Sequence, residues 1–260
     1  MANPHHLSLL LQGKDAWNHW REQHPEVQPD LSEANLRRTD LSGFDFHGTN
    51  FRNVDLSYAN LTEVNLQDAL LPSAQLRGAN LSEGNVQRAD FYGADLSQAY
   101  LGDGVDAMLR SVDAHDADFS NATLSQANLC GIDLSRAKLK NANLDGADLR
   151  HANLHEAYLE AADFRRTNLR WVRMQQAMAN SVNLSGADLT HADLRGSNLS
   201  STGFNGADLT HADVRASVLI GADLSGADLS GTNLEDANLE GVDLSRVVYH
   251  DISLETFFPE

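Results

Sequence analysis

Two neighbouring columns of residues, with members 20 positions apart, carry the side chains of this 260-residue chain that could bind a metal or a partner. Neighbouring histidines in one column could share a metal ion, but two imidazoles without a nearby carboxylate or thiolate make a poor site. Tryptophan and arginine are enriched among the hot spots of protein interfaces. We therefore predict no metal site. The predicted partner contact consists of Arg150, His151, Arg170, Trp171, His191 and His211.

The placement of these side chains follows from a period of five residues. In residues 143–154, leucine and alanine each recur at every fifth position. Five is neither the helical period of 3.6 nor the strand period of 2. Within Ala147-Asp148-Leu149 the two apolar side chains point inward and the aspartate outward, as in a short strand. The two polar residues that follow, as in Arg150-His151, must turn the chain.

Units of this kind wind into a coil. Four sides let four leucines fill a square centre, whereas three would crowd it and five would leave a void, which close packing disfavours. One coil then takes 20 residues, and successive coils pair their backbones about 4.8 Å apart. Residues 20 apart consequently lie one above another, so each column becomes a row on the surface.

This pattern resembles that of the pentapeptide repeat proteins from about residue 30 to residue 254. Self-similarity at one period over such a length does not arise by chance. The resemblance implies an all-β solenoid, a right-handed quadrilateral parallel β-helix. Counting the units gives about eleven coils, or a rod of roughly 50–55 Å at strand spacing. Relatives in the quinolone-resistance group are acidic rods thought to imitate DNA on the surface of gyrase.

Composition excludes several classes of function. The net charge of −18 argues against direct binding of nucleic acid or of an anionic membrane. A single cysteine, Cys130, excludes an internal disulfide framework and fits a reducing cytosol, and we expect it to face solvent. No apolar run approaches ~20 residues, and the N-terminus lacks a signal-peptide pattern. We expect a cytoplasmic protein that does not contact membranes.

Catalysis is not expected either. The sequence has no nucleophile elbow, phosphate-binding glycine loop, Cys-x-x-Cys or His-Glu-x-x-His motif. A rod filled by leucine and phenylalanine also lacks the concave, water-poor site that catalysis requires. We therefore predict no enzyme and no cofactor.

The period divides the chain into five parts. Residues 1–29 lack it, and Trp17 and Trp20 suit a helical cap over the first coil, with a partner-docking helix as the alternative. Residues 30–101 form a first β-helix block, in which Phe44 fills a normally small slot beside Phe46. Residues 102–118 contain a break, residues 119–254 form a second block and residues 255–260 form a tail. In the second block, the volume lost at Ala179 is expected to be filled by Met174 or Met178.

The break and the tail each allow two interpretations. The spacing from Leu101 to Phe119 predicts a three-residue insertion before Leu109, either a neutral bulge or a protruding contact loop. Topoisomerase-protecting family members carry functional loops at such breaks. In the tail, Phe257 and Phe258 fit either a cap on the last coil or a homodimer through the C-terminal end. The candidate contact loop consists of Gly102, Asp103, Gly104, Val105 and Asp106.

Charge is zoned along the predicted rod. Residues 119–180 carry 8 basic and 6 acidic groups, net +2, whereas residues 181–260 carry 3 and 13, net −10. The acidic zone has about one net charge per 2 Å at strand spacing, close to the 1.7 Å of duplex DNA. Taken as a whole, the sequence favours a non-enzymatic scaffold that binds an unidentified protein. The alternative is an acidic DNA mimic that binds gyrase or another type II topoisomerase.

Overall fold

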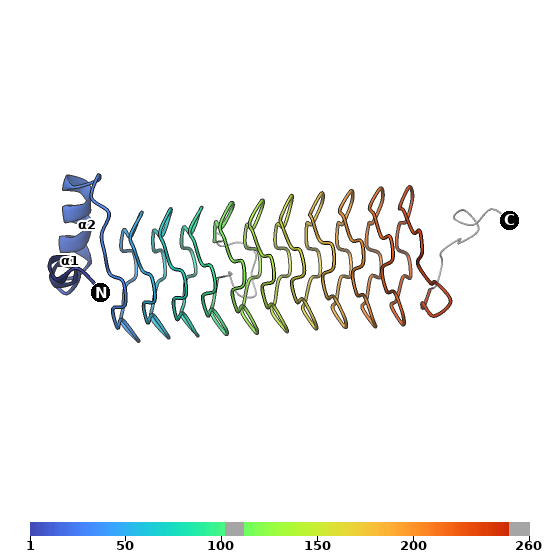
Figure 1. Cartoon of the computed structure of the whole chain (residues 1–260), viewed down its shortest axis with the longest axis horizontal. Coiled ribbons are helices and arrows are strands. Elements are labelled where there is room, and N and C mark those ends of the chain that lie inside the picture. Colours follow the sequence, from blue (N-terminus) through green and yellow to red (C-terminus); the bar gives the residue numbers. More distant parts are fainter. Residues whose placement is uncertain (102–111, 250–260) are drawn as a thin grey trace.

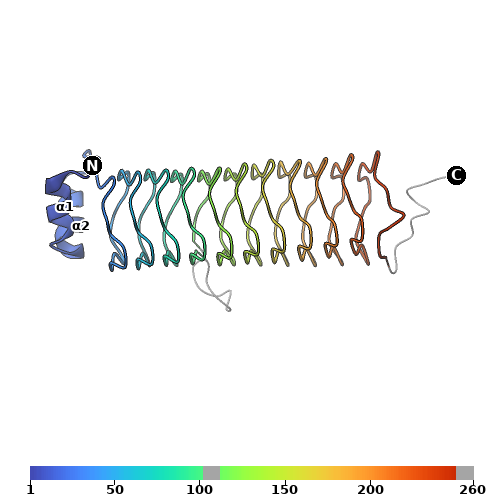
Figure 2. The same ribbon diagram turned by 60° about the horizontal axis from the view of Figure 1, so that its bottom comes forward.

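The chain folds into a rod of stacked coils. A computed structural model describes residues 1–101 and 112–249. In the described residues, parallel backbone bridges recur every five residues from Asp30 to Asn238, with a last one at Val248, and outside one break each joins residues 20 apart. Each bridge is a single residue pair, and no longer strand forms within the described ranges. A coil therefore has four bridged sides, and the coils stack along one axis (Figures 1 and 2).

Each corner is a tight turn closed by backbone hydrogen bonds. At one corner the carbonyl of Leu149 accepts the N–H of Ala152 at 3.0 Å, and the N–H of His151 donates to the carbonyl of Arg170 in the next coil, also at 3.0 Å. His151 has a φ of +58°, whereas the residue before it does not have a positive φ. A positive φ only at the third turn position is the geometry of a type II turn. Hydrogen bonds to the neighbouring coil thus hold non-glycine residues in a conformation that they disfavour alone.

The interior is a continuous stack of apolar side chains. Leu149 is fully buried and Ala147 is only 1% exposed, and the other units repeat this pairing of one large and one small inward group. The rings of Phe91 and Phe119 lie parallel with centroids 4.9 Å apart, about one coil spacing. Large side chains of successive coils therefore lie directly over one another, here across the register break, where the two residues are 28 positions apart.

The Asn or Asp between the two inward residues fixes the corner that follows it. Oδ1 of Asp188 accepts the N–H of Thr190 at 3.0 Å, and Oδ1 of Asp208 accepts the N–H of Thr210 at 2.9 Å. Short polar side chains commonly bond the backbone two residues on in this way. Many of the acidic groups of the rod therefore have a structural role in the repeat.

The register break is larger than the sequence predicted. Asn85 pairs with Asp113, an interval of 28 residues, and Val86 donates to the carbonyl of Asp113 at 2.9 Å. The break therefore adds eight residues to the coil, not three. The expected length was wrong because three and eight leave the same five-residue phase. Pairing resumes at Asp113, ahead of the predicted start of the second block at residue 119.

Two helices lie across the N-terminal end of the rod (Figure 1). Helix α1 spans Pro4–Leu10 and helix α2 spans Lys14–Gln23. Trp17 is fully buried, donates from Nε1 to the carbonyl of Asp45 at 2.7 Å, and packs edge-on against Phe46. None of the described helices is long and apolar enough to span a bilayer.

Phe44 packs beside Phe46 near these helices, as the sequence predicted. The ring of Phe44 is 5% exposed and stacks on Phe46, with centroids 5.3 Å apart. Phe44 therefore fills a position that is alanine in most units, and its ring lies parallel to that of Phe46 beneath α2.

The structure excludes one of the two methionines offered as alternatives, and the expected exposure of Cys130 was wrong. Met174 is buried in the core, but Met178 is 41% exposed because it occupies the outward position of its unit. Cys130 is only 7% exposed, not solvent-facing. Its side chain is short, and the long side chain of Arg150 follows in the same column one coil later. The pKa of the Arg150 guanidinium is raised mainly by its hydrogen bond to Asp148. Cys130 also contributes to this rise, so the two side chains lie near each other.

Candidate functional site

Four of the predicted contact residues form one stack of parallel rings, which we call the aromatic ridge: His151, Trp171, His191 and His211. The centroid of Trp171 lies 6.4 Å from that of His151 and 4.1 Å from that of His191. The His191 and His211 rings follow at 5.2 Å. Interplanar angles of 10–16° along the stack keep the rings parallel. The structure therefore brings together residues that are up to 60 positions apart in sequence.

The ridge forms because its members share one position in the corner. All four have φ between 58° and 59°, so their side chains leave the backbone in the same direction. At the C-terminal end of the ridge, an added Cβ on Gly231 would lie 2.3 Å from Nδ1 of His211. The His211 ring therefore leans over the following coil, as Tyr58 leans over Gly78 at the same corner position.

Trp171 is the large apolar group of the ridge. Its side chain lies between two imidazole rings, yet the residue remains 48% exposed. Parallel aromatic contacts contribute about 0.5–1.5 kcal/mol beyond area burial, which holds the indole in one orientation. A rigid, half-exposed tryptophan is the kind of anchor that protein interfaces use.

The two arginines of the predicted contact differ. Arg150 folds onto Asp148, with Nη2 to Oδ2 at 2.7 Å, and this hydrogen bond raises the pKa of the guanidinium. Arg170 has its nearest carboxylate oxygen, on Asp188, at 3.9 Å, and its side chain is 49% exposed. Arg170 is thus the more available cation beside Trp171, and Arg150 is largely committed to its own coil.

The histidines of the ridge do not form a metal-binding cluster. Within residues 1–101 and 112–249, no three His, Cys, Asp or Glu side chains lie close enough to hold one ion. Face-to-face stacking also places the ring nitrogens in separate parallel planes, where they do not converge on a common point. The arrangement suits contact along the ring edges instead.

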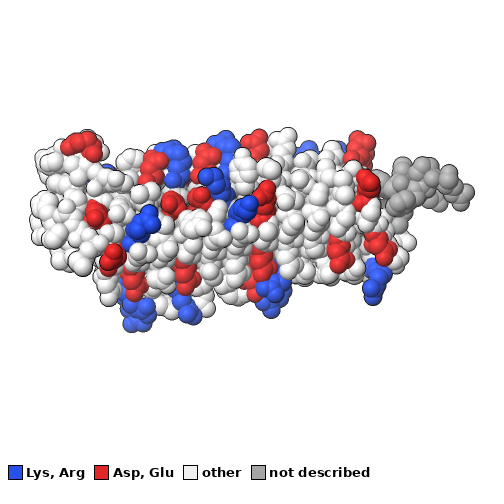
Figure 3. All heavy atoms as spheres, in the orientation of Figure 1, with Lys and Arg blue, Asp and Glu red and all other residues white. Residues whose placement is uncertain are grey.

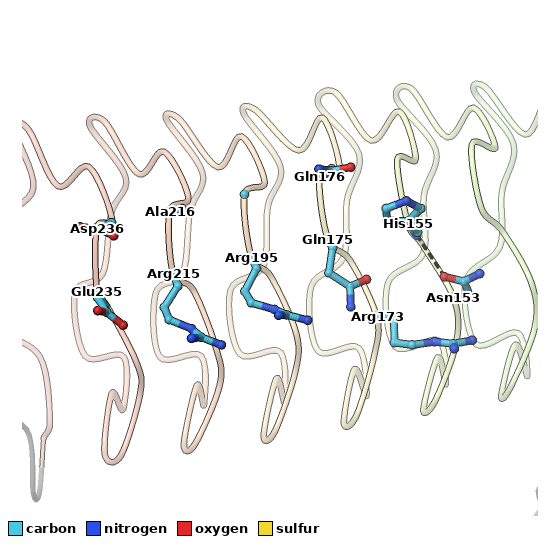
Figure 4. A pocket seen from close by; sticks show the side chains of 11 residues that line it. Asn153, His155, Arg173, Gln175, Gln176, Arg195, Arg215, Ala216, Glu235 and Asp236 are labelled. Carbon is cyan, nitrogen blue, oxygen red and sulfur yellow. Dashed lines mark hydrogen bonds between the residues drawn. The ribbon is translucent and has the colours of Figure 1, made fainter.

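A groove that was not predicted from the sequence lies beside the ridge. The groove has a volume of about 930 Å³ and crosses several coils (Figure 4). Arg173, two residues beyond Trp171, lies at one end, and Glu235 and Asp236 line the other. The signal was present in the sequence, since several lining residues again recur at intervals of 20. The groove is lined by Asn153, His155, Arg173, Gln175, Gln176, Arg195, Gly196, Arg215, Ala216, Glu235 and Asp236.

Most of the basic side chains in residues 119–180 are paired with carboxylates. Arg166 pairs with Asp145, and Arg136 bonds Asp116 through two nitrogens at 2.9 and 3.0 Å. Figure 3 shows basic groups beside acidic ones on the visible face. Hydrogen bonds from Arg136 lower the pKa of the Asp116 carboxyl. The net charge of +2 therefore describes a mosaic rather than a continuous basic surface.

Two of the predicted contacts lie outside the described residues. These are the candidate contact loop, Gly102 to Asp106, and the tail residues Phe257 and Phe258. Both remain predictions from the sequence.

Comparison with known proteins identifies the repeat. The family model described as Pentapeptide repeats matches the chain in 8 copies, over residues 30–68, 59–98, 117–155, 142–177, 180–215 and 207–246. No curated protein matched the chain.

Several solved structures are similar to the chain. HetL, a pentapeptide repeat protein involved in heterocyst differentiation regulation in the cyanobacterium Nostoc sp. strain PCC 7120, is 30% identical, with 86% of this chain and 94% of HetL covered and a TM-score of 0.32. A trypsin-treated variant of QnrB1, a plasmid-mediated fluoroquinolone resistance protein, is 16% identical, with 82% and 90% covered and a TM-score of 0.39. The pentapeptide repeat protein alr5209 from Nostoc is 32% identical, with 38% and 79% covered and a TM-score of 0.27.

Proposed function

Because the chain belongs to the pentapeptide repeat family, we propose that it is a non-enzymatic scaffold that binds another protein through the aromatic ridge. In this proposal the rod is a right-handed, four-sided β-helix of about eleven coils. Helices α1 and α2 cap its N-terminal end, and the protein acts in the cytoplasm without cofactors and without contacting nucleic acid or membrane directly.

The observation that carries the proposal is the half-exposed indole of Trp171 between the parallel rings of His151 and His191. Fixing an exposed aromatic group before binding reduces the entropy lost when a partner packs against it. The nearby guanidinium of Arg170 adds a charged group of the kind that interface hot spots favour.

Protein capture from native lysate tests this proposal. Immobilised wild type and Trp171→Ala are compared, with Tyr58→Ala as the matched control. Tyr58 is also an exposed aromatic residue at a corner with positive φ, but it lies several coils away. We expect Trp171→Ala to lose partners that Tyr58→Ala retains. Equal recovery by all three proteins would refute the role of the ridge.

The second candidate is a DNA mimic that binds gyrase or another type II topoisomerase. It is favoured by the net charge of −10 in residues 181–260; the described part of this zone, residues 181–249, carries 3 basic and 10 acidic groups, net −7. QnrB1 is a fluoroquinolone resistance protein, but this chain is only 16% identical to it, so that role is not carried over. A homodimer through the C-terminal end would double the acidic length.

A gyrase supercoiling assay with and without a quinolone separates the two candidates. The mimic predicts that micromolar protein inhibits supercoiling or relieves the quinolone effect. The scaffold predicts neither, and an unchanged assay would remove the mimic. An effect on supercoiling that Trp171→Ala leaves intact would favour mimicry over binding through the ridge.

A further inference from the structure

The groove beside the aromatic ridge carries opposite charges at its two ends. The guanidinium of Arg173 lies at one end and the carboxylates of Glu235 and Asp236 at the other (Figure 4). All three residues are exposed, and none has an ion-pair partner within 4.0 Å among the described residues. Each end therefore presents a charge without an ion pair, although the raised pKa of the Arg215 guanidinium, due mainly to its hydrogen bond to Asp213, also has a contribution from the nearby carboxylate of Glu235.

The middle of the groove is closer to neutral. Arg195 binds Asp193 through Nε and Nη2, at 2.8 and 2.7 Å. Arg215 binds Asp213 in the same way, at 2.9 and 2.7 Å. Bidentate pairs of this kind hold the guanidinium groups in fixed positions. The two arginines thus form a rigid wall rather than a free positive site.

Small residues open the groove between these side chains. Gly196 and Ala216 occupy successive coils at the corner position where Gln176 and Asp236 carry longer side chains. The groove therefore forms where two successive coils have short side chains at this corner position, and longer side chains bound it at both ends. Its course follows the rod axis, so an extended chain fits it better than a compact molecule does.

The separation of the charges sets the size of the occupant. From the coil of Arg173 to the coil of Glu235 is three coil spacings, or about 14 Å. An extended chain rises about 3.3 Å per residue, so about four residues span this distance. A lone phosphate or carboxylate would reach only one end, and nucleic acid would be repelled by the carboxylates at the other.

We propose that this groove binds an extended segment of the partner protein, with an acidic residue at the Arg173 end and a basic residue about four positions away at the Glu235 end. The inference rests on the proposed scaffold function and names the partner's chemistry. Because Arg173 is two residues from Trp171, the same segment can reach the ridge from the groove. The Arg173 end also lies in the part of the chain with a net positive charge, residues 119–180, whereas the Glu235 end lies in the acidic part, residues 181–260.

A peptide-display selection tests the proposal. Random 12-residue peptides are selected on the full-length protein in low salt, where exposed charges are least screened. We expect enriched sequences with an acid and a base about four positions apart. Enrichment of sequences without this pair, or no enrichment, would overturn the proposal.

Charge reversal then locates the bound peptide. Arg173→Glu should weaken an enriched peptide about tenfold, and changing the peptide's acidic residue to lysine should restore binding. Arg52→Glu is the matched control, since Arg52 is an exposed arginine on a distant coil with no ion pair in the described structure. Equal weakening by the control, or no rescue by the swapped peptide, would contradict the assigned groove.

This result can be separated from a failure of the scaffold itself. Protein capture that depends on Trp171 but survives Arg173→Glu would keep the scaffold and remove the groove assignment. Capture that is indifferent to Trp171 would remove the scaffold, whatever peptides were selected.

Discussion

Replacing Leu149 by alanine tests the stacked core at its centre. Leu149 is fully buried, and the leucines one coil before and after it, Leu129 and Leu169, are at most 1% exposed. Removing the side chain leaves a cavity that is bounded above and below by other large side chains. Leucine-to-alanine changes in cores cost about 2.7–5.0 kcal/mol, and the cost is greatest where the site cannot collapse.

Collapse is restricted here because both neighbouring coils hold the backbone. The N–H of Leu149 donates to Asn168 at 2.8 Å, and the N–H of Asp148 donates to Ala127 at 3.0 Å. We therefore expect a loss near the upper half of that range, about 4 kcal/mol. Trp171→Ala, in the next coil, removes a half-exposed side chain and should cost only about 1 kcal/mol.

Guanidinium unfolding followed by circular dichroism measures both variants. Because each coil of a solenoid contacts only its neighbours, unfolding can proceed in stages, so hydrogen exchange at the amides of Ala147 and Ala152 provides a local measurement. Faster exchange should be concentrated around the altered coil. A cost for Leu149→Ala equal to or below that of Trp171→Ala would refute the assignment of inward and outward positions.

Three further predictions concern a corner, an ion pair and the N-terminal helices. Gly231→Ala should lower the thermal midpoint and displace the ring of His211, visible as a changed imidazole NMR signal, because the glycine has a φ of +67° and no room for a Cβ. The hydrogen bond from Arg215 lowers the pKa of the Asp213 carboxyl, so this pair stabilises the fold above the ordinary aspartate pKa, and the stabilisation is lost as pH falls through the lowered value. The free energy of unfolding of Asp213→Asn should therefore fall less steeply than that of the wild type as the pH is lowered. Trp17→Ala should cost about 3–5 kcal/mol in unfolding experiments, since the indole is fully buried against the first coil.

The sequence predicted the architecture because the period alone determines it. Once Leu149 must point inward and five residues make one side, coil size and register follow, and the stacking of His151, Trp171 and His191 follows from them. Features that break the period were less accessible. The break after Leu101 preserved its five-residue phase, so its length was ambiguous from spacing and only backbone pairing resolved it.

The site was predictable only in part for a related reason. The period states which side chains point outward, but not how they pair with one another. Arg150 and Arg170 have equivalent positions in the repeat, yet only Arg150 has a carboxylate in bidentate contact. The groove was missed because it arises from side-chain length, where Gly196 and Ala216 follow a longer residue in their row.

Photo-crosslinking from position 171 tests the binding role of the ridge most directly. A photoreactive phenylalanine analogue replaces Trp171 in one protein and Tyr58 in another, and both are irradiated in cells that express them. We expect one or a few specific protein adducts from position 171 that position 58 does not form. Absence of adducts from position 171, or the same adducts from both positions, would contradict it.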